Sequence, residues 1–447
     1  MSDCVLVCNV FNTYIFLYRG LLIMLRALAP IISVAPVRAM MDERFSVLVE
    51  NLPPAAPVTV QSHHYSDDQD DWEAYGHYIS DHNGTVSVSK HLSFGGTYSG
   101  VEPMGLLWSM CPVPGSRMGL RLRKKDVCTP LVVNISVYSG HDGFRDKKPL
   151  ASAITERWYM APGVKRIEVN ENGVRGTLFI PPGPGPFPGI LDMWGGGGGL
   201  HEYRAALLAS HGYTALALEY FKPGELQTAN LKFQYFENAF RIIQDHPKVN
   251  PDSVGILGLS LGSSIALGLA AYSNIIKPRA CVCIGANHTN GLEVHESKDG
   301  FINLEQAIVD ENNHHIWRNI GLAMMRDPSN LVDVQRINCP VLLVSGQDDQ
   351  NWPSVEMADD ITQKMHDVGK AHQLTRIDYP DAGHLIEPPF SPHFRATNFM
   401  VKDKYKVIVL WGGQTKPHSD AQEDSWRKIL VFFQQHLYSI TSPKAKL

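Results

Sequence analysis

The sequence has little net charge and few charged residues. Of its 447 residues, 40 are Lys or Arg and 45 are Asp or Glu, so the formal net charge is −5 and charged residues make up 19% of the chain. A chain without a cationic excess lacks the electrostatic footprint of a nucleic-acid-binding protein. We therefore expect no nucleic acid among its partners. A hydrophobic content of 44% also excludes a wholly disordered chain.

Cysteine pairs are missing as well. The seven cysteines are odd in number and thinly spread, and none belongs to a CxxC motif. This pattern excludes a disulfide framework and supports no structural metal, so we expect no metal site and a reducing, intracellular compartment. Cys281 and Cys283 lie in an apolar run and are predicted to be small buried side chains of a strand.

Long uninterrupted hydrophobic runs are absent too. The most apolar stretch is residues 1–29, and polar side chains interrupt it at Asn9, Asn12, Arg19 and Arg26. Because arginine is costly at mid-bilayer, we expect no stable membrane insertion, and an anchor is the least favoured interpretation. The segment is either a cleavable presequence, which would point to mitochondria, or an extension before a start at Met24.

The remaining length exceeds what one hydrophobic core usually serves, so two domains are expected. Residues 30–155 contain short β runs separated by turn residues, which predict an all-β sandwich. In residues 156–440, near-continuous apolar strands alternate with helices, as in a parallel sheet covered on both faces. Predicted helices include Leu261–Tyr272 and a closing helix over Ser425–Leu437. The tail, residues 441–447, ends in a sequence that resembles a peroxisomal address: Ala445, Lys446 and Leu447.

The main chemical signal is a GxSxG motif. Gly258-Leu-Ser260-Leu-Gly262 follows a predicted strand and opens a predicted helix, which is the context of a nucleophile elbow. The competing interpretation is that Ser260 only caps the helix. As a nucleophile, the serine needs a base to take its proton and an acid to orient that base.

Both partners occur later in the chain, in the order typical of this class of hydrolase. Two adjacent aspartates follow a predicted strand, and we favour Asp349 over Asp348 as the acid. The predicted base is His384, which follows a short strand and a glycine.

The negative charge of a tetrahedral intermediate requires two backbone N–H groups. We expect one from Leu261, after the nucleophile, and one from Gly196 in the glycine run Gly195–Gly199. The run could instead cradle a phosphate, but it lacks the Gly-Lys-Ser/Thr ending of a P-loop.

Longer motifs show a resemblance to a known family. From about Ile31 to the C-terminus, the chain resembles acyl-coenzyme A thioesterases that share a fold with bile acid-CoA:amino acid N-acyltransferases. The resemblance rests on five segments: Gly95–Trp108, Glu156–Val164, Pro184–Ile190, Ser345–Trp352 and Gly383–Pro389. It implies an N-terminal immunoglobulin-like β-sandwich and a C-terminal α/β-hydrolase domain with a mostly parallel sheet. It also places the family's catalytic Ser, Asp and His at Ser260, Asp349 and His384.

The resemblance implies hydrolysis of medium- to long-chain fatty acyl-CoA through an acyl-serine intermediate, with no cofactor other than the CoA of the substrate. The alternative is conjugation of the acyl group to taurine or glycine, but that branch carries Cys where Ser260 stands. A catalytically dead binding protein is not favoured, because no triad member is missing. The elbow departs from the family at Leu261 and Ser263, which leaves the acyl-chain preference open. The expected compartment is the peroxisome, reached through an import receptor, with cytosol or mitochondria as alternatives.

Overall fold

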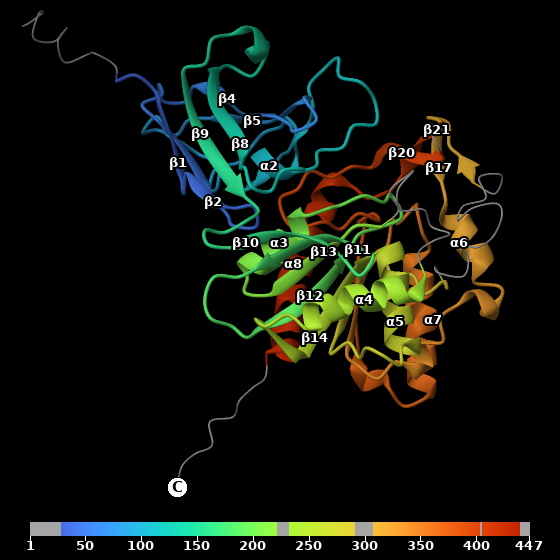
Figure 1. The fold of residues 1–447 in the computed structure, drawn as a ribbon. Helices are drawn as coiled ribbons and strands as arrows, with labels where there is room; N and C mark the ends of the chain where they lie inside the picture. Colours follow the sequence, from blue (N-terminus) through green and yellow to red (C-terminus); the bar gives the residue numbers. More distant parts are fainter. Residues whose placement is uncertain (1–27, 221–231, 291–306, 403–404, 439–447) are drawn as a thin grey trace, which may run out of the picture.

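The computed structural model describes residues 28–220, 232–290, 307–402 and 405–438 (Figure 1). The predicted tail, residues 441–447, lies outside these ranges, and so does the N-terminal segment up to residue 27. Figure 1 shows an all-β region beside a layered α/β region. Among the described residues, no helix combines the length and apolar character needed to cross a bilayer.

The N-terminal region contains two sheets. One has three strands in the order β1 (Ile31–Ala35), β3 (Ser46–Glu50) and β6 (Val86–Ser87). The other has six strands in the order β2 (Arg38–Met40), β9 (Ala151–Trp158), β8 (Leu131–Ser139), β4 (Pro57–Tyr65), β5 (Asp71–Ile79) and β7 (Cys111–Pro112). A short helix, α2 (Gly105–Trp108), and a 3-10 turn at Phe144–Asp146 lie between strands.

Alternation of side chains along these strands creates the N-terminal core. In β8, Leu131, Val133 and Ile135 are buried. The residues that alternate with them, Val132 and Asn134, are exposed. Successive side chains of a strand point to opposite faces, so one face of the sheet is apolar. Buried residues of both sheets belong to one hydrophobic cluster. The region is therefore two sheets packed on a shared core.

The C-terminal region is built on an eight-stranded sheet. Its order is β10 (Lys165–Glu171), β11 (Val174–Ile180), β13 (Thr214–Leu218), β12 (Phe187–Met193), β14 (Val249–Leu259), β15 (Cys281–Ile284), β18 (Val341–Gly346) and β19 (Leu374–Tyr379). The pairs β10–β11 and β11–β13 are antiparallel, and the other pairs are parallel. The carboxyl ends of the parallel strands therefore meet at one edge.

Helices cover both faces of this sheet (Figure 1). On one face, α3 (Tyr203–Ser210) and α8 (Thr415–Leu437) share a hydrophobic cluster with the N-terminal region. On the other face lie α4 (Phe233–Gln244), α5 (Leu261–Tyr272) and α7 (Ser354–Asp367). Because both faces are covered, the central strands are continuously apolar, as the four buried residues of β15 illustrate.

A smaller sheet was not predicted from the sequence. It has the order β16 (Ile308–Val309), β17 (His314–Ile316), β21 (Tyr405–Leu410) and β20 (Ala396–Lys402). The described part of the C-terminal region also contains α6 (Arg318–Met324) and 3-10 turns at Pro328–Asn330, Val334–Arg336 and Ala371–Gln373. After β21 the chain turns through Gly412 and Gly413 into α8, which brings the start of that helix to the loop that carries His384.

The closing helix is longer than the sequence predicted. It begins at Thr415, whereas the prediction began at Ser425. The earlier residues were missed because the first ten residues of the helix are mostly polar and contain Pro417. Proline is tolerated in the first turn, where its missing N–H would have no partner within the helix. The apolar spacing that signals a helix therefore starts later than the helix does.

Candidate active site

Ser260 lies in a strained turn between β14 and α5. Its backbone angles are φ 57° and ψ −114°, a region that non-glycine residues rarely adopt. The Ser260 N–H donates to the carbonyl of Ile284, at 2.8 Å, at the end of the neighbouring strand β15. The turn therefore places the serine at the carboxyl edge of the parallel strands.

The two motif glycines explain why this turn needs GxSxG. A Cβ added at Gly258 would lie 2.2 Å from the carbonyl oxygen of Gly262. A Cβ added at Gly262 would lie 2.5 Å from the carbonyl oxygen of Met193, in the adjacent strand β12. Both distances are far below van der Waals contact, so the strand and helix can approach this closely only through glycine.

Asp349 and His384 form a buried pair. Oδ2 of Asp349 and Nδ1 of His384 are 2.7 Å apart, and both side chains are at most 1% exposed. The carboxylate also accepts hydrogen bonds from the N–H groups of Asn351 and Trp352 and from the hydroxyl of Ser354, at 2.8–2.9 Å. These donors fix the carboxylate, so it can orient the imidazole with Nδ1 as the donor and leave Nε2 as the basic nitrogen.

The neighbouring Asp348 points elsewhere. Its Oδ2 accepts hydrogen bonds from Arg395, at 3.0 Å, and from the N–H of Gly413, at 2.8 Å. Burial acts to raise the pKa of Asp348, but hydrogen bonds from Gln350, Arg395 and Gly413 outweigh it and hold that pKa below its usual value. Of the two adjacent aspartates, Asp349 is thus the one in contact with His384.

His384 and Ser260 both lie at the end of β15. A Cβ added at Gly285 would lie 3.1 Å from Cε1 of His384, so the imidazole packs directly on this glycine. Gly285 immediately follows Ile284, whose carbonyl holds the Ser260 N–H. The structure therefore brings His384 to the same strand end as Ser260, from segments 124 positions apart in the chain.

The glycine run lies beside Ser260. A Cβ at Gly195 would be 3.4 Å from Cβ of Ser260, and a Cβ at Gly196 would be 3.7 Å from Cδ2 of Leu261. Within the described residues, no acceptor takes the N–H of Gly196 or of Leu261. The residues that carry the two predicted oxyanion donors are therefore neighbours, and neither N–H is taken by another described residue.

Sequence reasoning missed a polar cluster next to the site. Glu387, three residues after His384, accepts a 2.7 Å hydrogen bond from the hydroxyl of Tyr203 and pairs with Arg121. The guanidinium of Arg121 also stacks on the ring of Trp194, 4.6 Å from its centre. Arg121 belongs to the N-terminal region, between β7 and β8. That region therefore reaches the loops on both sides of the site, although nothing local in the sequence signals it.

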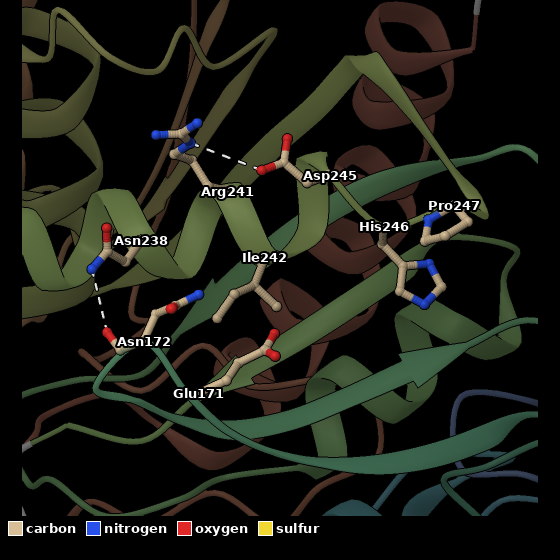
Figure 2. Close-up of a pocket in the computed structure, with 8 residues that line it drawn as sticks. All are labelled: Glu171, Asn172, Asn238, Arg241, Ile242, Asp245, His246 and Pro247. Atoms are coloured by element: carbon tan, nitrogen blue, oxygen red, sulfur yellow. Dashed lines mark hydrogen bonds and ion pairs between the residues drawn. The ribbon is translucent and has the colours of Figure 1, made fainter.

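A separate groove lies beside α4 and the β10–β11 turn (Figure 2). It has a volume of about 560 Å³, and Figure 2 shows the residues that line it, among them Arg241 and Asp245, whose charged atoms are 3.9 Å apart. None of Ser260, Asp349 and His384 lines this groove. Among the described residues, no group of His, Cys, Asp and Glu side chains is placed to hold a metal ion.

A mostly parallel sheet with a strained serine at a strand–helix turn, next to a buried Asp–His pair, defines an α/β-hydrolase. Comparison with protein families is more specific. Residues 42–171 match the acyl-CoA thioester hydrolase/BAAT N-terminal region, and residues 231–439 match the BAAT/acyl-CoA thioester hydrolase C-terminal region. The chain belongs to the acyl-CoA thioester hydrolase/BAAT family, so the resemblance found in the sequence is confirmed.

Curated relatives match along nearly the whole chain. A mouse peroxisomal succinyl-coenzyme A thioesterase is 37% identical over 435 residues, covering 93% of this chain and 99% of the relative. Mouse acyl-coenzyme A thioesterase 5 is 37% identical, covering 94% and 100%. Rat acyl-coenzyme A thioesterase 2, mitochondrial, is 34% identical, covering 90% and 88%.

Similarity to solved structures is weaker. An esterase/lipase from an uncultured bacterium aligns with a TM-score of 0.41 and 13% identity, covering 63% of this chain and 87% of the other. A 2,6-dihydroxy-pseudo-oxynicotine hydrolase aligns with a TM-score of 0.38 and 16% identity, covering 62% and 68%.

Proposed function

We propose that the protein hydrolyses acyl-CoA thioesters to a free carboxylic acid and CoA, with Ser260, His384 and Asp349 as its catalytic triad. The observation that carries the proposal is the buried Asp349–His384 pair at the strand end where Ser260 lies. Family membership and the thioesterase relatives along nearly the whole chain supply the substrate class.

In this mechanism the hydroxyl of Ser260 attacks the thioester carbonyl while Nε2 of His384 takes its proton. The charge that develops on the carbonyl oxygen is received by the N–H groups of Leu261 and Gly196. His384 then returns the proton to the leaving CoA thiolate, and Asp349 stabilises the imidazolium throughout. Water, activated by the same histidine, releases the acid from the acyl-serine. No cofactor is required beyond the CoA of the substrate.

The test is release of free CoA from a panel of acyl-CoAs by the wild type and by Ser260→Ala. We expect hydrolysis to fall by at least about 10³-fold in the variant, because the residual rate comes only from binding and the oxyanion site. Ser89→Ala, a serine of the N-terminal region, is the matched control and should keep the wild-type rate. Hydrolysis that survives Ser260→Ala would contradict the proposal.

The same panel defines the acyl chain. We propose medium- to long-chain fatty acyl groups, and the panel also includes succinyl-CoA, since one relative carries that substrate in its name. Each reaction is run with and without taurine or glycine. Product that forms only with the amino acid would identify the conjugating activity instead. A serine nucleophile argues against that outcome, because an oxygen ester favours transfer of the acyl group to an amine less than the thioester of a cysteine nucleophile does.

The N-terminal region is proposed to be an immunoglobulin-like sandwich, residues 30–155, that shapes the entrance to a hydrolase domain, residues 156–440. The contact of Arg121 with Glu387 and Trp194 supports this role.

The peroxisome is the proposed compartment, through recognition of Ala445, Lys446 and Leu447 by an import receptor. Relatives with peroxisomal and with mitochondrial names make both destinations worth testing. A fluorescent fusion to the N-terminus, with and without the last three residues, tests the peroxisomal address, and a fusion to the C-terminus, which leaves residues 1–29 free, tests the mitochondrial one.

A further inference from the structure

The loop that carries His384 is held through three consecutive residues. The N–H of His384 itself donates to the carbonyl of Trp411, at 2.9 Å. The N–H of Gly383 donates to Nδ1 of His418, at 3.0 Å, and the carbonyl of Leu385 accepts a hydrogen bond from Nε2 of the same ring, at 2.8 Å. One imidazole thus bridges the residue before the base and the residue after it.

These two contacts fix the protonation state of His418. A backbone N–H can only donate, so Nδ1 must be the acceptor, and a carbonyl can only accept, so Nε2 must carry the hydrogen. Only the neutral Nε2–H tautomer satisfies both. The ring is 2% exposed, and burial, reinforced by the nearby His393, lowers the pKa of His418 to about 3. It therefore stays neutral across the physiological range.

Close packing leaves the loop no room to shift. A Cβ at Gly413, just before α8, would lie 2.6 Å from the nitrogen of Gly383 and 3.1 Å from Nδ1 of His418. The N–H of Gln414 donates to the carbonyl of Asp381, at 2.8 Å, two residues before Gly383. The start of α8 and the loop of His384 are therefore one packed unit.

We propose that His418 is a positioning residue for the catalytic base. By holding the backbone on both sides of His384, it keeps the imidazole on Asp349 and directed at Ser260. The inference rests on the proposed function, because it assigns His418 to the triad that the proposal describes. A displacement of about 1 Å in a catalytic group can cost on the order of 10²-fold in rate.

Two substitutions separate the effect of the His418 hydrogen bonds from the effect of its side-chain volume. His418→Phe keeps an aromatic ring but removes both the donor and the acceptor, and we expect kcat to fall by about 10–100-fold with KM unchanged. His418→Gln restores one acceptor and one donor and should recover kcat to within about fivefold of wild type. Should His418→Phe not fold, His418→Asn replaces it, because its shorter amide reaches Gly383 but not Leu385 and should give an intermediate kcat.

A matched control removes a buried histidine elsewhere. His64, in β4, is 5% exposed and contacts the carbonyl of Val132, at 2.8 Å. His64→Phe should lower the melting temperature without changing kcat. If the His418 variants behave in the same way, His418 is structural only and the inference is wrong.

Labelling by a fluorophosphonate distinguishes the two proposals. The reagent reports how readily Ser260 is activated by its base, whatever the natural substrate. Wild type that labels at Ser260 but hydrolyses no acyl-CoA would contradict the proposed function alone. In that case slower labelling of His418→Phe, rescued in His418→Gln, still supports the inference. Equal labelling rates in wild type and both variants would overturn it.

Discussion

At the scale of single residues, the two adjacent aspartates after β18 show what the sequence could and could not decide. The motif narrowed the acid to Asp348 or Asp349 and favoured the second. The contacts differ sharply, because Asp349 meets His384 while Asp348 meets Arg395 and Gly413. The direction in which each aspartate side chain points depends on the geometry of the turn after β18, and the residue types on either side do not determine that geometry.

This difference predicts unequal effects of matched substitutions. Asp349→Asn should reduce kcat by about 10⁴-fold, because an amide at this position stabilises the wrong tautomer of His384 and cannot balance the imidazolium. Asp348→Asn changes charge and shape in the same way but should leave kcat much closer to wild type. Steady-state kinetics of both variants on one acyl-CoA would check this. Equal losses would mean that the acid has been assigned wrongly.

The glycines of the site should also divide into two groups. Gly262→Ala should destabilise the fold by about 3 kcal/mol, because its Cβ would overlap the carbonyl of Met193. Gly196→Ala meets nothing closer than 3.7 Å, so its melting temperature should stay near wild type while KM or kcat changes at the substrate. Thermal unfolding and kinetics together test the contrast. A strongly destabilised Gly196→Ala would show that its loop is a packing element rather than a ligand-facing one.

At the scale of elements, apolar periodicity predicted the central strands and the helices that cover them, and α5 has the predicted bounds. It failed where polar residues form regular structure. The first ten residues of α8 carry no apolar stripe, so the sequence did not predict that His418 lies in a helix. The four-stranded sheet was missed for a different reason in part: β16 and β17 have only two and three residues, and β17 pairs with β21 across a long stretch of chain, whereas β20 and β21 are consecutive strands.

An ion pair between two of these elements gives an energetic test. Arg204 of α3 and Asp192 of β12 are 2.5 Å apart and at most 3% exposed. Arg204→Met should lower the free energy of unfolding by about 3–5 kcal/mol, because it leaves a buried carboxylate without its partner. Adding Asp192→Leu to that variant should restore much of the loss. Denaturant unfolding of the single and double variants decides whether the pair or the packing of α3 is responsible.

At the scale of the whole molecule, hydrogen bonds and ion pairs join the all-β region to the α/β region. Oδ2 of Asp42, after β2, accepts from Nε1 of Trp426 at 2.8 Å and contacts Nε2 of His211 at 2.6 Å. Arg44 pairs with Glu423 nearby. Chain length and the pattern of strands and helices predicted two regions, but such contacts join residues far apart in the chain and leave no trace in local sequence.

The contact between Asp42 and His211 predicts a pH-dependent stability. The hydrogen bond to Asp42 raises the pKa of His211 above its ordinary value of 6.5. A raised histidine pKa stabilises the fold fully below pH 6.5, and that contribution is lost as pH rises through the folded-state pKa. The difference in melting temperature between wild type and His211→Gln should therefore be largest near pH 6, and the two melting temperatures should converge at alkaline pH. A difference that grows with pH would contradict this.

The distance between Ser260 and His418 along the chain has a consequence for biosynthesis. Ribosomes extend a chain by about 5–20 residues per second, so roughly 8–30 s separate the appearance of these two residues. For most of that interval the emerging polypeptide carries Ser260 but not His384, and throughout it lacks His418 and the later part of α8, the helix that contacts β14 and β18. Under the proposed mechanism, a nascent chain cannot hydrolyse acyl-CoA until His384 and α8 have been translated.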